Sequence, residues 1–278
     1  MKDHSRQWRQ FRFVYPVVSR RAGGLSLGIN LNPDRRCNFD CVYCEVDRSA
    51  PPRATAPDPA AVRAELTVLI RSALTGWLAM DEKFADTPEL TRHIRDLAFS
   101  GDGEPTLVPD FSTYAALVAE VREAEGLADT RIVLITNATG LDKADVRRGL
   151  EILDAHHGEI WAKLDAGTED YYRRVNRSAV RFDRILRNLR ETARRRPIVI
   201  QSLFLKMRGE PMPEKELEAY CERLRELRAE GGQIREVHAY TIARPTPEPW
   251  ATRLEPEELT ALAARIRERT GLTVREFC

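Results

Sequence analysis

Short aliphatic runs alternate with longer amphipathic stretches along the whole chain. The runs that predict strands are residues 25–31, 96–100, 131–136, 159–165, 198–205 and 234–242. Between them, apolar residues recur at helical spacing, as at Val146, Leu150 and Leu153. Asp58 followed by Pro59 predicts an N-cap and a helix that runs towards Leu74. Strands that alternate with helices in series predict an α/β fold, because parallel neighbours need crossover connections.

The segments between these elements do not indicate a domain boundary. The proline-rich stretches 50–59 and 244–250 have the composition of loops, and no repeat or low-complexity linker is visible. A chain of 278 residues is also within the size of one α/β barrel domain. We therefore expect a single domain over residues 1–278.

Composition and charge narrow the function classes. The chain has 44 Lys and Arg against 43 Asp and Glu, with 42% hydrophobic residues, which excludes a disordered, collagen-like or membrane-spanning chain. The net charge of +1 removes the simplest reason to expect a nucleic-acid binder. The start MKDHSRQWRQFRF has no apolar signal-peptide core, and the longest aliphatic runs fall far short of the roughly 20 residues of a membrane helix. We expect a cytoplasmic protein with no membrane partner.

The cysteines are the most informative feature. Cys37, Cys41 and Cys44 fall within eight residues, directly after the first predicted strand, whereas Cys221 and Cys278 stand alone. Disulfides are not expected in a reducing compartment. Three thiolates on one loop can hold a cubane [4Fe–4S] cluster and leave one iron open for another ligand. Tetrahedral zinc is the alternative, but it would need a fourth ligand from elsewhere, and no second cysteine pair is present.

A glycine-rich turn follows the second predicted strand. Gly101 and Gly103 allow the backbone to turn tightly and to approach a ligand, and Asp102 and Glu104 place carboxylates at the carboxyl end of the strand. An ordinary turn before the next helix is the alternative interpretation.

Polar side chains at other strand ends are further candidates. Lys163 and Asp165 share one face of a strand that should be apolar on both faces, so they are expected either to bind a ligand or to form a salt bridge. Thr136 and Asn137 end the third strand, where helix capping is the alternative. Weaker candidates of the same kind are Gln201, Ser202 and Tyr240.

The Cys37-x3-Cys41-x2-Cys44 loop, with Tyr43 before the last cysteine, resembles the signature of the radical S-adenosylmethionine (radical SAM) superfamily. The resemblance implies a single-domain partial (β/α)6 barrel of TIM type with parallel strands. Its core would span about residues 24–243, with a helix and strand of residues 255–277 packing on it. Within the superfamily, residues 25–48, the Gly-Asp-Gly-Glu-Pro segment and residues 161–168 are similar to the group that includes wyosine-forming tRNA enzymes.

The resemblance also implies cofactors and chemistry. One [4Fe–4S] cluster on the three cysteines would bind S-adenosylmethionine at its open iron and cleave it reductively to a 5′-deoxyadenosyl radical, which abstracts hydrogen from a substrate. Lys163 and Asp165 would be catalytic and would also contact the cofactor. The other residues expected to bind the cofactor are Tyr43, Gly101, Asp102, Gly103, Glu104, Thr136, Asn137, Gln201 and Ser202.

Partners and substrate stay open at this point. The expected partner is an electron donor such as flavodoxin or ferredoxin, and the protein would be oxygen-sensitive. The substrate could be a tRNA base, a small molecule or a peptide. A non-catalytic Fe–S or zinc-binding module is the alternative from another class, and it would require Cys221 or Cys278 as the fourth ligand.

Overall fold

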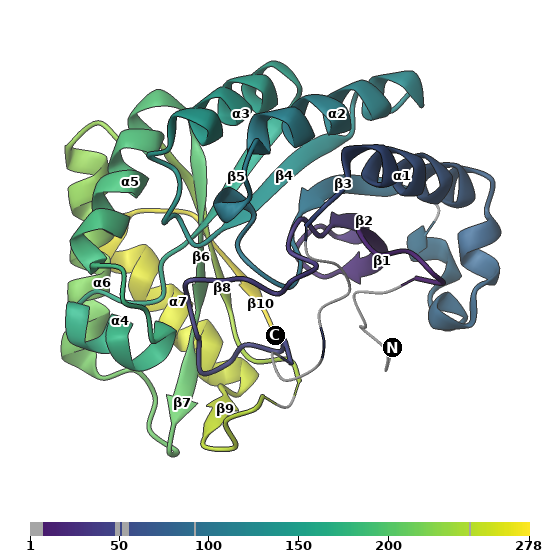
Figure 1. Ribbon diagram of the computed structural model, residues 1–278. Helices are drawn as coiled ribbons and strands as arrows, with labels where there is room; N and C mark the ends of the chain where they lie inside the picture. Colours follow the sequence, from purple (N-terminus) through teal and green to yellow (C-terminus); the bar gives the residue numbers. More distant parts are fainter. Residues whose placement is uncertain (1–7, 48–50, 52–55, 92, 245) are drawn as a thin grey trace. The chain divides into compact units, whose positions relative to one another are not determined.

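Strands and helices alternate along the chain in the computed structural model (Figure 1). It describes residues 8–47, 51, 56–91, 93–244 and 246–278. The chain divides into two compact units, one of residues 1–37, 50–135 and 142–159 and the other of residues 38–49, 136–141 and 160–278. Each unit has its own strands and helices.

The first unit is built on the strands β1 (Val14–Ser19), β2 (Gly24–Ile29), β3 (Ile94–Phe99) and β4 (Arg131–Thr136), in that order. β1 is antiparallel to β2, whereas β2, β3 and β4 are parallel. Leu27 lies opposite Leu97, and both side chains are buried. The last residue of β4, Thr136, belongs to the second unit.

The helices of the first unit are α1 (Pro59–Leu74), α2 (Phe111–Ala124) and α3 (Ala144–Ala155), with short 3-10 turns at Trp77–Met80, Glu82–Phe84, Pro88–Thr91 and Pro105–Leu107. As the sequence predicts, α1 begins after Asp58, whose carboxylate accepts the Ala60 N–H at 3.1 Å. α1 packs on β1, β2 and α2, and α2 packs on α3.

The second unit holds the parallel strands β5 (Gly158–Lys163), β6 (Ile198–Leu203), β8 (Ile234–Tyr240) and β10 (Val274–Phe277), in that order. The first two residues of β5 belong to the first unit. Two short strands, β7 (Leu205–Met207) and β9 (Ala251–Arg253), form a separate antiparallel pair. The predicted run 198–205 is therefore divided between β6 and β7.

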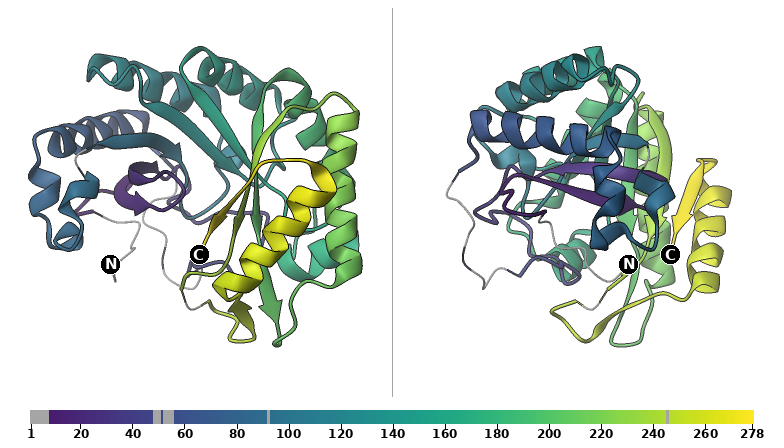
Figure 2. Two further views of the ribbon diagram at one scale, coloured as in Figure 1. Left: turned by 180° about the vertical axis from the view of Figure 1, so that it is seen from behind. Right: turned by 90° about the vertical axis from the view of Figure 1, so that its right-hand side faces the viewer.

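The helices of the second unit are α4 (Glu169–Asn176), α5 (Phe182–Arg195), α6 (Glu214–Ala229) and α7 (Pro256–Thr270). Consecutive helices contact each other, and α7 packs on β8 and β10 (Figure 2). The helix and strand expected within residues 255–277 are α7 and β10, and β10 pairs with β8 as part of the sheet.

The predicted α/β class with parallel strands is confirmed. None of the helices in the described residues has the length and apolar character needed to cross a membrane. A single domain over residues 1–278 stays a prediction.

Candidate functional site

The cysteine loop of the second unit, residues 38–44, is bound to the carboxyl end of α4. The backbone N–H of Asp40 donates to the Asn176 carbonyl at 3.0 Å, and that of Val42 donates to the Val175 carbonyl at 2.9 Å. The last carbonyls of a helix have no partner within the helix, so they are available to a neighbouring loop. The residues on both sides of Cys41 are thereby fixed to α4.

Further contacts hold the two ends of this loop. The Ser178 hydroxyl donates to the Asn38 carbonyl at 2.7 Å, and the Phe39 ring meets the Tyr172 ring edge-on, with centroids 5.5 Å apart. At the other end, the Cys44 N–H donates to the Cys41 carbonyl at 2.9 Å and closes a turn.

Cys37, Cys41 and Cys44 are all half-buried and none is in a disulfide. In the part of the chain that the structure describes, no three His, Cys, Asp or Glu side chains are grouped as ligands of one metal ion. A cubane cluster binds each thiolate at a different iron corner, so its ligands do not converge on one ion. Burial raises the pKa of the Cys41 thiol to about 12, and Lys163 acts in the opposite direction. A bound metal deprotonates a coordinating thiol.

The chemistry of the donor set fits an iron–sulfur cluster. All three donors are thiols, and each is accessible in part from outside the protein. The Asn176 side-chain amide lies with Nδ2 3.4 Å from Cys41 Sγ, where it can donate to a sulfur. Hydrogen bonds to the sulfurs are among the features that set the properties of such clusters. The assignment of Cys37, Cys41 and Cys44 as metal ligands stays a prediction.

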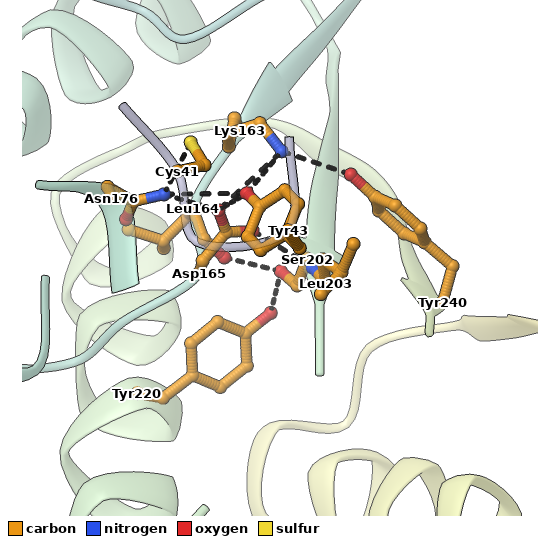
Figure 3. A network of polar contacts seen from close by, with 10 residues as sticks. All are labelled: Cys41, Tyr43, Lys163, Leu164, Asp165, Asn176, Ser202, Leu203, Tyr220 and Tyr240. Atoms are coloured by element: carbon orange, nitrogen blue, oxygen red, sulfur yellow. Dashed lines mark hydrogen bonds and ion pairs between the residues drawn. The ribbon is translucent and has the colours of Figure 1, made fainter. Parts of the chain in front are cut away.

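Lys163 and Asp165 lie in a buried polar network beside Cys41 (Figure 3). Lys163 Nζ donates to the Tyr43 hydroxyl at 2.9 Å and to the Tyr240 hydroxyl at 3.0 Å. It also lies 3.5 Å from Asp165 Oδ2. The salt bridge considered from the sequence is therefore present, and Tyr43 and Tyr240 are part of the same network.

The Asp165 carboxylate is engaged at both oxygens. Oδ1 accepts the Leu203 backbone N–H at 2.9 Å. Oδ2 accepts the Tyr43 hydroxyl and the Asn176 amide, the latter at 2.8 Å. The side chain is fully buried, whereas that of Lys163 is 18% exposed. A buried charge is tolerated only when it is paired and hydrogen-bonded, and these contacts meet that condition.

The network shifts the ionisation of its members. Burial alone would lower the pKa of Lys163, but the Asp165 carboxylate and the Tyr240 oxygen raise it above its ordinary value. Burial and the neighbouring Asp165 raise the pKa of Tyr43 well above its ordinary value. Lys163 is therefore an ammonium and Tyr43 a neutral phenol that donates to Asp165.

Behind Asp165, the Ser202 hydroxyl donates to the Leu164 carbonyl at 2.6 Å and lies 2.6 Å from the Tyr220 hydroxyl of α6. Gln201 is buried on the same strand, and its carbonyl accepts the Leu164 N–H at 3.0 Å. These contacts connect β6 to the segment that carries Asp165.

Thr136 and Asn137 stabilise the turn that follows β4. The Thr136 hydroxyl accepts the Ala138 N–H at 3.0 Å, and Asn137 Oδ1 accepts the Thr139 hydroxyl at 2.7 Å. The Asn137 amide also donates to Asn38 Oδ1 at 2.8 Å, which joins this turn to the cysteine loop. Neither residue caps the next helix, because the N-cap of α3 is Lys143, so the capping alternative is wrong. Contact of Thr136 and Asn137 with a cofactor stays a prediction.

The Gly-Asp-Gly-Glu segment lies in the first unit, against the chain that leads from β2 towards Cys37. The Asn30 amide donates to the Asp102 carboxylate at 2.8 Å, and Asn30 Oδ1 accepts the Asp102 N–H at 3.1 Å. A Cβ on Gly101 would lie 2.3 Å from Asn30 Oδ1. The close approach therefore requires glycine at position 101.

Gly103 and Glu104 contact the same stretch of chain. A Cβ on Gly103 would lie 2.0 Å from the Arg36 carbonyl oxygen, which also accepts the Glu104 N–H at 3.1 Å. The Glu104 carboxylate is buried and accepts the Thr106 hydroxyl at 2.6 Å. Asn30 is a residue that the sequence analysis did not single out, although it directly follows a strand.

Sequence reasoning also missed Glu216 and gave Asn176 no role. The buried Glu216 of α6 holds the turn between β5 and α4: its carboxylate accepts the Gly167 N–H at 2.6 Å, the Thr168 N–H at 3.1 Å and the Thr168 hydroxyl at 2.6 Å. In the sequence, Glu216 has only the signature of a helical surface carboxylate.

The chain is similar to one protein family and to several curated proteins. The sequence profile of the Radical SAM superfamily matches residues 31–217. Among curated proteins, the chain is 28% identical over 188 residues to a protein of Brachyspira hyodysenteriae named GTPase Obg, covering 66% of the chain and 23% of that protein. It is 30% identical over 167 residues to a UPF0026 protein of Methanocaldococcus jannaschii, covering 58% of the chain and 43% of that protein. The chain thus spans less than half the length of these relatives.

Two solved structures share the fold. SuiB of Streptococcus suis bound to S-adenosylmethionine aligns with a TM-score of 0.58 at 13% identity, over 93% of this chain and 52% of that one. Archaeal TYW1 aligns with a TM-score of 0.50 at 14% identity, over 88% of this chain and 72% of that one. The likeness confirms the predicted partial α/β barrel fold. Because the profile matches well over half of its residues, cysteine loop included, the chain belongs to the Radical SAM superfamily.

Proposed function

We propose that the protein is a radical SAM enzyme in which Cys37, Cys41 and Cys44 hold one [4Fe–4S] cluster. The observation that carries the proposal is the extent of the family match. Residues 31–217 include all three cysteines, the Gly101–Glu104 segment and the Lys163–Asp165 pair. Membership of the superfamily supports the proposal that the protein is an enzyme. SuiB, which shares the fold, has a crystal structure with S-adenosylmethionine bound.

When bound, the cluster would supply one electron to S-adenosylmethionine held at its open iron. The bond between the sulfonium sulfur and the 5′ carbon would then break to give methionine and a 5′-deoxyadenosyl radical, which can abstract hydrogen from the substrate. The protein's part in such chemistry is to hold the cofactor and exclude competing reactions. The network of Lys163, Asp165 and Tyr43 supports that role, because a buried and fully hydrogen-bonded group holds its geometry.

The residues proposed to contact S-adenosylmethionine are those that the sequence singles out. Lys163 and Asp165 are proposed as catalytic residues. The Lys163 side chain is 18% exposed, and its ammonium is the group that we propose contacts a ligand. The remaining proposed contacts are Tyr43, Gly101, Asp102, Gly103, Glu104, Thr136, Asn137, Gln201 and Ser202.

A flavodoxin or ferredoxin is the proposed electron donor, and the cytoplasm the proposed location. For the substrate, a tRNA base and a small molecule are the two proposals. They differ in a measurable way, because binding that neutralises several phosphates weakens steeply with salt, by a logarithmic slope of roughly 0.9 per phosphate on duplex nucleic acid. A small molecule with few charges gives a shallow slope.

The test of the proposal is anaerobic reconstitution followed by analysis for iron, sulfide and zinc. Dithionite and S-adenosylmethionine are then added, and 5′-deoxyadenosine is measured by chromatography. We expect four iron atoms per chain, because the proposed cubane has four iron corners, and 5′-deoxyadenosine from the wild type. Cys41→Ala should form no product, whereas Cys221→Ala, a change at a buried cysteine of α6, should behave as the wild type.

Zinc in place of iron in the purified protein would refute the enzyme proposal. Loss of the cluster in Cys221→Ala or Cys278→Ala would indicate a fourth protein ligand and a closed cluster, as in a non-catalytic module. A full cluster without product, with dithionite and with reduced flavodoxin alike, would limit the proposal to cluster binding.

A further inference from the structure

Asn176, the last residue of α4, touches the cysteine loop through both its main chain and its side chain. Its carbonyl accepts the Asp40 N–H at 3.0 Å, and the carbonyl before it accepts the Val42 N–H at 2.9 Å. Between these two anchors, Asn176 Nδ2 lies 3.4 Å from Cys41 Sγ. The sulfur of Cys41 therefore has a fixed position relative to this amide (Figure 3).

The orientation of the Asn176 amide follows from Asp165. Nδ2 lies 2.8 Å from Asp165 Oδ2, and an ionised carboxylate accepts hydrogen bonds but cannot donate them. The other carboxylate contacts are also donors, namely the Leu203 N–H and the Tyr43 hydroxyl. The nitrogen, and not the oxygen, of Asn176 must therefore face Asp165 and Cys41.

The amide has two N–H groups, and one is taken by Asp165. The second has two acceptors within reach, since Cys41 Sγ and the Tyr43 hydroxyl oxygen are each 3.4 Å from Nδ2. The Tyr43 oxygen already accepts from Lys163 at 2.9 Å. A thiolate carries charge and is the stronger acceptor, because charge-assisted hydrogen bonds are roughly twice as strong as neutral ones.

We infer that Asn176 is a positioning residue that donates a hydrogen bond to the Cys41 sulfur and makes the bound cluster easier to reduce. The inference rests on the proposed function, because it requires a cluster on Cys41. Reduction adds one negative charge to the cluster and its sulfurs, so an N–H donor stabilises the reduced form more than the oxidised form. Removing the donor should make the reduction potential more negative.

Asn176→Leu is the variant that tests this role, because leucine keeps a similar volume and has no donor. Ser178→Ala is the matched control. Its hydroxyl anchors the same loop at 2.7 Å through the Asn38 carbonyl and, among the described residues, not through a cysteine sulfur. A merely structural effect of loosening the loop should appear in both variants, whereas loss of the N–H donor to sulfur occurs only in Asn176→Leu.

The measurement is a redox titration of the reconstituted protein, without S-adenosylmethionine, followed by electron paramagnetic resonance of the reduced cluster. In Asn176→Leu we expect the equilibrium constant for one-electron reduction to fall at least threefold. This is a negative shift of about 28 mV, because tenfold corresponds to 59 mV for one electron. Ser178→Ala should keep the wild-type potential.

An unchanged potential in Asn176→Leu, or an equal shift in Ser178→Ala, would overturn the inference while leaving the proposed function intact. A wild-type protein that takes up no cluster would overturn both. If Asn176→Leu does not retain a cluster, the wild type labelled with side-chain ¹⁵N-asparagine decides. A ¹⁵N coupling to the reduced cluster supports the hydrogen bond, and its absence overturns it.

Discussion

The close contact between Gly103 and the chain before the cysteine loop, within the first unit, can be tested by substitution. A Cβ at position 103 would lie 2.0 Å from the Arg36 carbonyl oxygen and 2.7 Å from the Asn32 Cβ. Ordinary van der Waals contacts of a Cβ begin near 3.4 Å. In Gly103→Ala, the two backbone segments must therefore move apart by more than an ångström.

The expected loss of stability has two parts. Forcing an extra methyl group into a packed site costs about 1–3 kcal/mol. Separation of the segments also breaks the hydrogen bond from the Glu104 N–H to the Arg36 carbonyl, which is 3.1 Å long and contributes about 1 kcal/mol. The free energy of unfolding should therefore fall by about 2–4 kcal/mol, measured by urea denaturation of wild type and variant.

Gly126→Ala is the control for this experiment. Gly126 has φ +73°, and nothing lies within 4 Å of a Cβ built there. The only cost is that of a left-handed conformation, about 1–2 kcal/mol. Gly103 has no positive φ, so the loss of stability in Gly103→Ala comes from the steric contact and from the hydrogen bond that it breaks.

A second measurement, the affinity of the reconstituted protein for S-adenosylmethionine, distinguishes an effect of Gly103→Ala on cofactor binding from its effect on stability. A displacement of an ångström in a positioning segment can cost roughly 100-fold in activity, so we expect Gly103→Ala to weaken binding at least tenfold and Gly126→Ala to leave it unchanged. An unfolding free energy for Gly103→Ala equal to that of the wild type would refute the close contact. Wild-type affinity in a destabilised Gly103→Ala would refute the placement of the cofactor at this segment.

Two further predictions concern the second unit. Glu216→Ala should lower the free energy of unfolding by about 3 kcal/mol in urea denaturation, because it leaves the buried N–H of Gly167 and the part-buried N–H of Thr168 without their acceptor. A loss below about 1 kcal/mol would contradict this, and Glu216→Gln should lose less stability than Glu216→Ala. Burial raises the pKa of Cys221 to about 11, so at pH 8 roughly 0.1% of it is thiolate, whereas Cys278 is exposed. In a protein whose three loop cysteines are changed to alanine, Ellman's reagent should therefore modify one thiol quickly and the second only on unfolding; two fast thiols would refute the burial.

Most of the strands were predictable from the sequence because a parallel strand covered on both faces is a continuous aliphatic run. Ile160, Trp161 and Ala162 of β5 are all buried, as that rule requires. β1 was not predicted, because Pro16 interrupts the hydrophobic pattern of residues 14–19. Proline cannot donate to a sheet ladder and is tolerated at an edge, which is where β1 lies in its sheet.

The division of residues 198–207 into β6 and β7 was not predictable for a different reason. β7 is defined by its pairing with β9, in which Leu205 lies opposite Arg253. Such pairing joins segments far apart in the chain, and a single sequence does not indicate which distant segments meet. Local hydrophobicity alone therefore extends the strand too far.

The same limit applies to the site. The cysteine spacing and the unexpected polarity of Lys163 and Asp165 are local features, and they identified the loop and the strand end. Their partners are remote, since Tyr43 and Asp165 are separated by 122 positions and Lys163 and Tyr240 by 77. The sequence could therefore offer a salt bridge or a ligand contact as alternatives, but not the network that contains the pair.

The two charged residues of this network, Lys163 and Asp165, differ in exposure and in their contacts. The Asp165 carboxylate is fully buried and accepts hydrogen bonds from Leu203, Tyr43 and Asn176. These contacts orient two groups beside Cys41, one from the cysteine loop and one from α4. Lys163 is partly exposed and keeps its charge because of Asp165. Of the predicted catalytic pair, Lys163 therefore has the more exposed side chain, and Asp165 is the member that holds Tyr43 and Asn176 in place.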